Sequence, residues 1–202
     1  MVSKSILIGT LLMFLGCAKS SFDQPQKLWD YLKDPRNDYH FVKKVRAVEY
    51  TLTYRPTDLM VSQELNEGAS MGAVDSIRRK YGPYMYFDLG ISIDGQEVLN
   101  RKVYDKQIFG ELVGQLSFGM ADKIHLITKN RDTIELMDFA YPRLYGLSKN
   151  TKILLVFQRE DKILVHDYFL LAIKDLGFET GEVTFKVDTD KIIKEPKLIF
   201  ND

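Results

Sequence analysis

Three histidines, His40, His125 and His166, are the side chains best suited to bind a metal ion or to act as a general base. Zinc sites built on one segment place their histidines three to five residues apart. Here the spacings are far longer, and His125 lies between Ile124 and Leu126, as expected for a residue in a strand. We therefore predict no metal site and expect the histidines to face solvent or to form local hydrogen bonds.

The acidic residues offer two weaker patterns. Asp88 and Glu97 could form a general acid and base, but a chain with 28 acidic residues contains many such pairs. The segment 188–190, Asp-Thr-Asp, could begin a calcium loop. An EF-hand loop needs Gly at its sixth position and Glu at its twelfth, where this chain has Ile193 and Ile199. We predict that the acids of the segment 188–190 cap a turn.

Thiol chemistry is excluded from the chain after position 17, because Cys17 is the only cysteine. A thiol nucleophile or a thiolate metal cluster would need a cysteine in the folded part. The sequence also lacks a Gly-x-Ser-x-Gly elbow and a Gly-x-x-x-x-Gly-Lys phosphate loop. We predict no catalytic residue, no cofactor and no bound metal.

Tyr84 and Tyr86 are the candidate binding residues, within the densest aromatic group of the chain. In a strand they share one face, opposite Met85 and Phe87. If that face were exposed, it could stack on sugar rings or grip a protein partner. If the helix predicted over Val103–Leu116 covers it, the tyrosines are core residues.

The first half of the chain mixes helices with two strong strands. Val48, Tyr50, Leu52 and Tyr54 alternate with polar residues, which predicts one buried strand face. The expected strands are Val45–Tyr54 and Tyr84–Ile93; the expected helices are Lys27–Lys33, Thr57–Leu65 with Thr57 or Asp58 as cap, Ala73–Tyr81 and Val103–Leu116.

The second half contains strands at short, regular spacing without a convincing helix. The expected strands are Lys123–Thr128, Thr133–Phe139, Lys152–Gln158, Val165–Asp175 and Glu182–Val187. This spacing predicts a mainly β fold, an immunoglobulin-like antiparallel β-sandwich with short helical insertions in its first half. The alternative is two subdomains, an α+β half to about Phe118 and a β half after it.

The N-terminal segment Met1–Cys17 has the layout of a secretory signal, with Lys4 before an apolar run and small Gly16 before the cysteine. Its last four residues, Phe-Leu-Gly-Cys, resemble the lipobox of bacterial lipoproteins. The resemblance implies a signal peptide over 1–16 and lipidation of Cys17, which would hold the protein in the cell envelope. The following Ala18, by similarity to enterobacterial sorting signals, implies the outer membrane.

Beyond the signal we expect a lipidated tether over 17–26 and a single β-rich domain over 27–202. Removing Met1–Gly16 takes out one lysine and no acid, so the remaining chain has one more acidic than basic residue. A nucleic-acid-binding domain needs a basic face, and binding to anionic lipid needs a polybasic segment. We therefore expect no nucleic-acid partner and a membrane contact made through the lipid anchor.

Three functions remain open at this stage. The first is a non-catalytic, lipid-anchored accessory or adaptor module of the bacterial envelope, with another envelope protein as partner. The second is a lipoprotein that binds a glycan or another small ligand, through Tyr84 and Tyr86 or through loops near Tyr141–Asn150. The third is a hydrolase whose acid pair is brought together by the fold.

Overall fold

The structure is a computed structural model that describes residues 21–66, 68–101, 104–143 and 148–200. The predicted lipidation site, Cys17, lies outside the described residues.

The larger sheet has six strands, all antiparallel to their neighbours. Its order is β2 (His40–Val45), β3 (Val48–Arg55), β4 (Tyr84–Ile93), β9 (Thr151–Gln158) and β8 (Asp138–Ala140), and β5 (Gln96–Glu97) pairs with β4. Since β4 pairs with β9 over eight residues, this sheet joins the two halves of the chain. The strands predicted around β3, β4 and β9 are confirmed, whereas β2 was missed.

The smaller sheet has four antiparallel strands. They run in the order β11 (Val183–Asp188), β10 (Tyr168–Ile173), β6 (Ile124–Thr128) and β7 (Thr133–Glu135). The hairpin predicted between β6 and β7 is confirmed: Arg131 takes a positive φ of 71°, and its backbone N–H donates to the carbonyl of Thr128.

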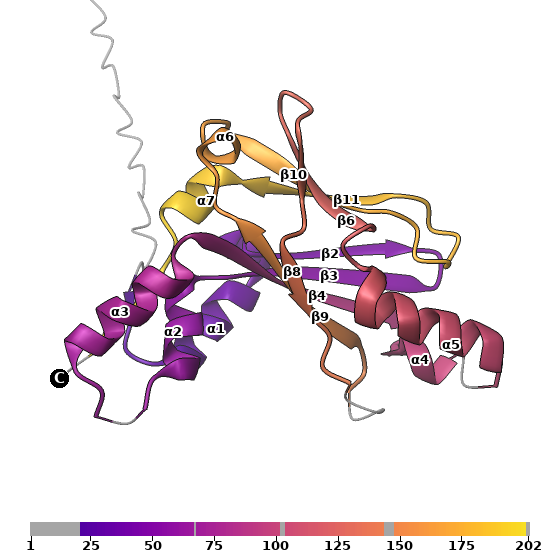
Figure 1. Ribbon diagram of the computed structural model, residues 1–202, viewed down its shortest axis with the longest axis horizontal. Helices are drawn as coiled ribbons and strands as arrows, with labels where there is room; N and C mark the ends of the chain where they lie inside the picture. The colour runs from indigo at the N-terminus through magenta and orange to yellow at the C-terminus, as the bar shows by residue number, and fades with distance from the viewer. Residues whose placement is uncertain (1–20, 67, 102–103, 144–147, 201–202) are drawn as a thin grey trace, which may run out of the picture.

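The two sheets lie one above the other, with the core between them (Figure 1). The predicted face of β3 is confirmed as core, because Val48, Tyr50, Leu52 and Tyr54 are all buried. The Phe87 ring of β4 lies 6.3 Å from the Phe169 ring of β10, measured between ring centroids. This contact joins the two layers directly.

The segment Thr133–Phe139 does not form the single strand that its alternation predicts. It is divided into β7, which pairs with β6, and β8, which pairs with β9 in the other sheet. Alternation records only which side chains are buried, and Ile134 and Leu136 remain buried across the change of sheet. The pattern therefore could not show where the pairing partner changes.

Helices contribute 33% of the structure and strands 35%, so the fold is mixed, with antiparallel sheets and more helix than the sequence predicted. The helices are α1 (Pro25–Lys33), α2 (Thr57–Glu64), α3 (Met71–Tyr81), α4 (Val98–Arg101), α5 (Lys106–Gly114), α6 (Asp161–Leu164) and α7 (Thr189–Ile193), with a 3₁₀ turn over Pro35–Asn37 and a π turn over Gln115–Gly119. The short helices α6 and α7 were not expected in the second half.

The N- and C-terminal segments meet beside these helices. Ser21 and Phe22 form β1, which pairs in parallel with β12 (Lys197–Leu198). Phe22 is buried, and α1 begins at Pro25. Phe22, a residue within the predicted tether 17–26, is part of the core.

Candidate functional site

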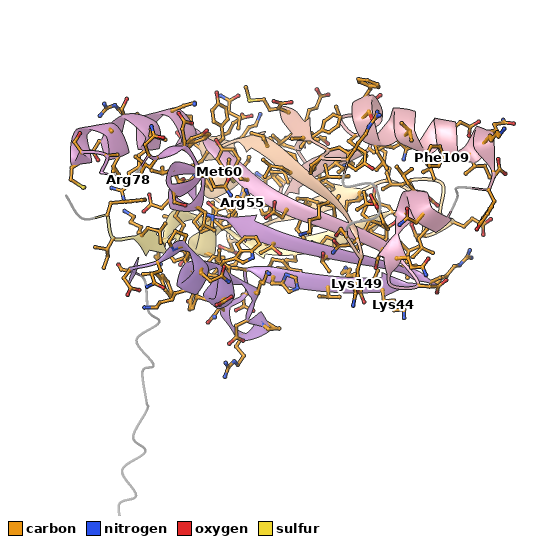
Figure 2. The ribbon with its side chains drawn as sticks, turned by 90° about the horizontal axis from the view of Figure 1, so that it is seen from below. Lys44, Arg55, Met60, Arg78, Phe109 and Lys149 are labelled. Carbon is orange, nitrogen blue, oxygen red and sulfur yellow. The ribbon has the colours of Figure 1, made fainter. Side chains whose placement is uncertain are left out.

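The outer face of the larger sheet, turned away from the smaller sheet, is the best candidate for a functional site. Helices α1, α2 and α3 flank this face at one end, and α4 and α5 flank it at the other (Figure 1). Figure 2 views this side, with Arg55 toward α2 and Lys44 and Lys149 toward the opposite end of the strands. The floor between them is made of outward-facing residues from adjacent strands.

A groove of about 280 Å³ lies on this face. Its lining is mostly polar and comes from α1, β2, β3, β4, β9 and the residue before β9: Trp29, Lys33, His40, Thr51, Thr53, Arg55, Asp88, Leu89, Gly90, Asn150 and Lys152. We call it the outer groove.

Strand register explains why these distant residues meet. Thr53 of β3 lies between His40 of β2 and Asp88 of β4, in one row across the sheet. Gly90 lies between Thr51 and Lys152 in the next row. Directly opposed residues share a face of an antiparallel sheet, so both rows face the outer groove.

Asp88 is held by Arg55. Arg55 donates to Asp88 Oδ2 through Nε at 3.1 Å and Nη2 at 2.9 Å, and its Nη1 donates to Gln63 Oε1 at 3.2 Å. Burial raises the pKa of Asp88 and outweighs the opposite effects of Arg55, Lys152 and Lys33. Arg55, Lys33 and Lys152 line the same groove as this carboxyl group.

His40 makes the local hydrogen bond that the sequence predicted for histidines in this chain. Its Nδ1 lies 2.7 Å from Thr53 Oγ1. Burial lowers the pKa of His40, and the nearby positive charge of Lys33 lowers it further. His40 therefore contributes a neutral ring to the outer groove at neutral pH.

Lys33 and Lys152 approach the outer groove from α1 and from β9. Neither forms an ion pair with any carboxylate of the described residues. The Lys33 ammonium lies 5.1 Å from the centre of the half-buried Trp29 ring, and the Arg55 guanidinium lies 5.6 Å from it. Trp29 thus lies beside two cations in the wall of the groove.

Gly90 leaves space at the floor of the outer groove because it has no side chain. A Cβ atom at this position would lie 2.4 Å from Thr51 Oγ1 and 3.0 Å from Asn150 Nδ2. The amide oxygen of Asn150 accepts a hydrogen bond from Ser148 Oγ at 3.1 Å, so its NH₂ group is the end near Gly90. An isolated glycine within a strand pattern often marks a close approach, and it was the one sequence signal that could have indicated this site.

Tyr84 and Tyr86 share the face that was predicted, but they form no exposed aromatic strip. Tyr86 is only 4% exposed, and its hydroxyl donates to the carbonyl oxygen of Tyr81 at 3.2 Å. Tyr84 is half-buried, with its ring 6.4 Å from that of Tyr86. The covering group is the end of α3, at Tyr81, and not the helix predicted over Val103–Leu116.

The other candidate catalytic residues are spread over the fold. Glu97 pairs with Ser92, so it lies on the same sheet face as Asp88 but four residues along β4, or about 13 Å. His125 lies in β6 of the smaller sheet, and no metal-binding group of acids, histidines or cysteines occurs among the described residues.

The predicted capping role of the acids at 188–190 is confirmed for Asp188. Asp188 Oδ1 accepts a 2.9 Å hydrogen bond from the backbone N–H of Asp190 and caps α7.

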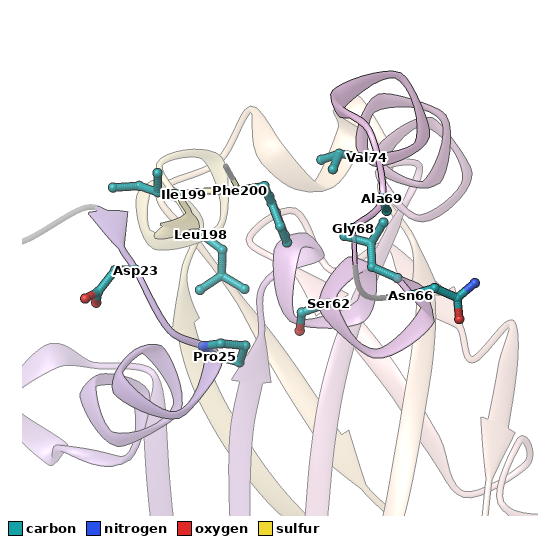
Figure 3. Close-up of a pocket in the computed structure, with 11 residues that line it drawn as sticks. Asp23, Pro25, Ser62, Asn66, Gly68, Ala69, Val74, Leu198, Ile199 and Phe200 are labelled. Atoms are coloured by element: carbon teal, nitrogen blue, oxygen red, sulfur yellow. The ribbon is translucent and has the colours of Figure 1, made fainter. Parts of the chain in front are cut away.

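A second hollow, of about 340 Å³, lies where the C-terminal segment meets α1, α2 and α3. Figure 3 shows Asp23 and Pro25 on one side, Asn66 on the other, and Leu198 and Phe200 between them. Its polar and apolar side chains are mixed, and among the lining residues Asp23 is the only one that carries a charge. It offers no comparable concentration of charge for a ligand.

The chain resembles no known protein in the comparisons made: no family model, no curated protein and no solved structure matches it. Within the described residues, no helix is both long and apolar enough to cross a membrane.

Proposed function

We propose that this protein is a lipid-anchored, non-catalytic module of the bacterial cell envelope that acts as an accessory or adaptor protein by binding. The anchor is supported by the lipobox-like sequence that ends at Cys17. Two or three acyl chains attached there would give stable membrane association, since each buried methylene adds about 0.8 kcal/mol. We assign the protein to the outer membrane from Ala18.

The observation that carries the binding role is the outer groove, an open polar hollow on the outer face of the larger sheet. Its single carboxylate, Asp88, is hydrogen-bonded to Arg55 and has no second acid beside it. A general acid–base mechanism requires a group free to exchange a proton with a substrate. This arrangement favours binding over hydrolysis.

A second candidate function is favoured by the same groove: a lipoprotein that binds a glycan or another small ligand. The sequence placed such binding on Tyr84 and Tyr86. Burial of Tyr86 moves the candidate to the outer groove, where Trp29, threonine hydroxyls and an asparagine amide are available. Both functions use the outer groove. They differ in the ligand, which is a protein in the first and a glycan or another small molecule in the second.

The subtype of the fold is also part of the proposal. Two facing antiparallel sheets support a sandwich, and we propose the immunoglobulin-like arrangement expected from the sequence as its subtype. Superposition of an experimentally determined structure on immunoglobulin domains, strand by strand, tests it.

Labelling and fractionation test the anchor. Wild-type protein expressed in a bacterial host should incorporate radiolabelled palmitate and stay with the membranes, whereas Cys17→Ser should lose the label and appear in soluble fractions. Persistent labelling of Cys17→Ser would refute the lipoprotein assignment.

Metal analysis and hydrolase screens on glycan, ester and peptide substrates test the non-catalytic role. Stoichiometric metal, or turnover abolished by changing His125, His166, Asp88 or Glu97, would place the protein among the enzymes. Affinity capture from detergent-solubilised envelope, with and without competing small ligands, distinguishes a protein partner from a small one.

A further inference from the structure

We propose that the outer groove binds a small organic anion, a ligand that carries one carboxylate or phosphate group beside hydroxyl groups. This inference rests on the second candidate function above and names its ligand class. Four observations support it: the charge of the lining, the unpaired lysines, the neutral donors on the floor and the size of the hollow.

The lining of the outer groove is positively charged. Lys33, Arg55 and Lys152 are cationic, Asp88 is the only acid, and His40 is held neutral by its surroundings. Two positive charges are therefore left uncompensated in a chain whose acidic and basic residues are equal in number. A hollow lined by one sign of charge concentrates ions of the opposite sign.

The excess charge belongs to the two lysines. Arg55 directs Nε and Nη2 to Asp88 and Nη1 to Gln63, so each of its three nitrogens already has an acceptor. Lys33 and Lys152 have no carboxylate partner among the described residues, and both lie near enough to Asp88 to act on its pKa. They come from separate elements, α1 and β9, and can approach one anionic group together.

The floor supplies neutral hydrogen-bonding groups next to the lysines. Thr51 Oγ1 and Asn150 Nδ2 flank Gly90, and neither has a hydrogen-bond partner among the described residues. A hydroxyl can donate or accept, and an amide NH₂ donates two hydrogen bonds. These groups suit the hydroxyls of a polar ligand next to its charged end.

The size of the outer groove sets the size of the ligand. Its volume, about 280 Å³, lies just below the range of about 300–1,000 Å³ found for sites that take drug-sized ligands. One sugar unit or a molecule of similar size fits this volume, with the Trp29 ring in the wall. Acidic monosaccharides and sugar phosphates combine all the features that the groove can recognise.

The test is a binding titration of the full-length protein in detergent. Binding is measured by NMR or by calorimetry. The probes are glucuronate and glucose 6-phosphate, with glucose as the uncharged match. We expect saturable binding of at least one anion with a dissociation constant of about 1 mM or tighter, weakened by added salt. Failure of both anions to saturate, or equal binding of glucose, would overturn the proposal.

Charge-removing variants locate the site. Lys33→Gln and Lys152→Gln should each weaken anion binding about fivefold, the effect of roughly 1 kcal/mol. The matched control is Lys44→Gln, an exposed lysine of β2 outside the groove lining, which should bind like wild type. An equal loss in the control, or no loss in either groove variant, would place binding elsewhere.

Gly90→Ala gives an independent test that keeps every charge. The added methyl would occupy the space beside Thr51 Oγ1 and should reduce binding while thermal unfolding shows a folded protein. Unchanged binding in folded Gly90→Ala would contradict the assigned floor. None of these results depends on the lipid anchor, so failure here leaves the labelling experiment to judge that part of the proposed function.

Discussion

The Tyr54 hydroxyl donates a 2.6 Å hydrogen bond to Glu195 Oε2, and so ties the most buried end of β3 to the segment between α7 and β12. Glu195 also accepts from the backbone N–H of Thr57 at 3.1 Å and from its hydroxyl at 2.8 Å, and Arg159 lies 3.4 Å away. Burial raises the pKa of Tyr54 well above its usual value, and Glu195 raises it further. The tyrosine therefore stays protonated and can donate.

Removing that hydroxyl should destabilise the protein. We expect Tyr54→Phe to lower the free energy of unfolding by about 1.5–3 kcal/mol, the usual contribution of a hydrogen bond to a charged group. Tyr104→Phe is the matched control, because Tyr104 is 98% exposed and should change stability by less than about 0.5 kcal/mol. Urea unfolding measures both. Equal stability of the two variants would show that the hydrogen bond contributes nothing.

A second buried carboxylate holds the C-terminal strand. Asp58 receives two hydrogen bonds of 2.8 Å from Arg78 and one of 2.9 Å from the backbone N–H of Leu198. Its place after Pro56 suggested a helix cap, but Asp58 pairs with Arg78 of α3 because the fold buries it almost fully.

We expect Asp58→Asn to cost about 1.5–3 kcal/mol, the usual contribution of hydrogen bonds to a charged group, because Arg78 is partly exposed and water can solvate it. Asp75→Asn is the control, since Asp75 lies 3.9 Å from the same arginine but is largely exposed. Chemical denaturation measures the free energy of unfolding of both variants. A decrease below about 1 kcal/mol for Asp58→Asn would show that the Asp58–Arg78 ion pair is dispensable.

Leu52 tests the predicted core face of β3. It is fully buried, so Leu52→Ala should lower the free energy of unfolding by about 2–5 kcal/mol through lost burial and a cavity. Val42→Ala on the neighbouring strand is the control, because Val42 is 54% exposed. A change below about 0.5 kcal/mol for Leu52→Ala, measured by urea unfolding, would contradict the buried position.

Asp175 should make stability depend on pH. Its carboxylate accepts hydrogen bonds from the backbone N–H groups of Gly177, Phe178 and Gly181, at 2.8–3.1 Å. Partial burial acts to raise the pKa of Asp175, but these amides outweigh it and leave the pKa lowered. The contribution is therefore present above the ordinary aspartate pKa and lost as pH falls through the lowered value.

Asp175→Asn should cost about 1 kcal/mol at neutral pH. The difference from wild type should shrink in acid, below the ordinary aspartate range, because wild type then loses the charged acceptor as well. Thermal unfolding from neutral to acidic pH measures this. A difference that stays constant over the range would show that the charge of Asp175 has no effect.

The local sequence pattern was sufficient to predict much of the larger sheet. The alternation of Val48, Tyr50, Leu52 and Tyr54 predicted a strand and its buried face, because a strand repeats every two residues wherever it lies. The pattern did not predict β2, an edge strand whose alternation is interrupted by two lysines. It also did not predict the division of 133–139, because the alternation continues where the chain passes from one sheet to the other.

Sequence alone also determined the lipobox resemblance, the absence of thiol chemistry after Cys17 and the lack of any spaced metal motif. Each of these is a property of neighbouring residues or of composition. The outer groove is different, because Lys33, Asp88 and Lys152 are separated by more than fifty residues at each step. The register of β3, β4 and β9 brings Asp88 and Lys152 to one face of the sheet, and α1 adds Lys33 from the side. Register and helix packing are interactions between segments that no single segment encodes.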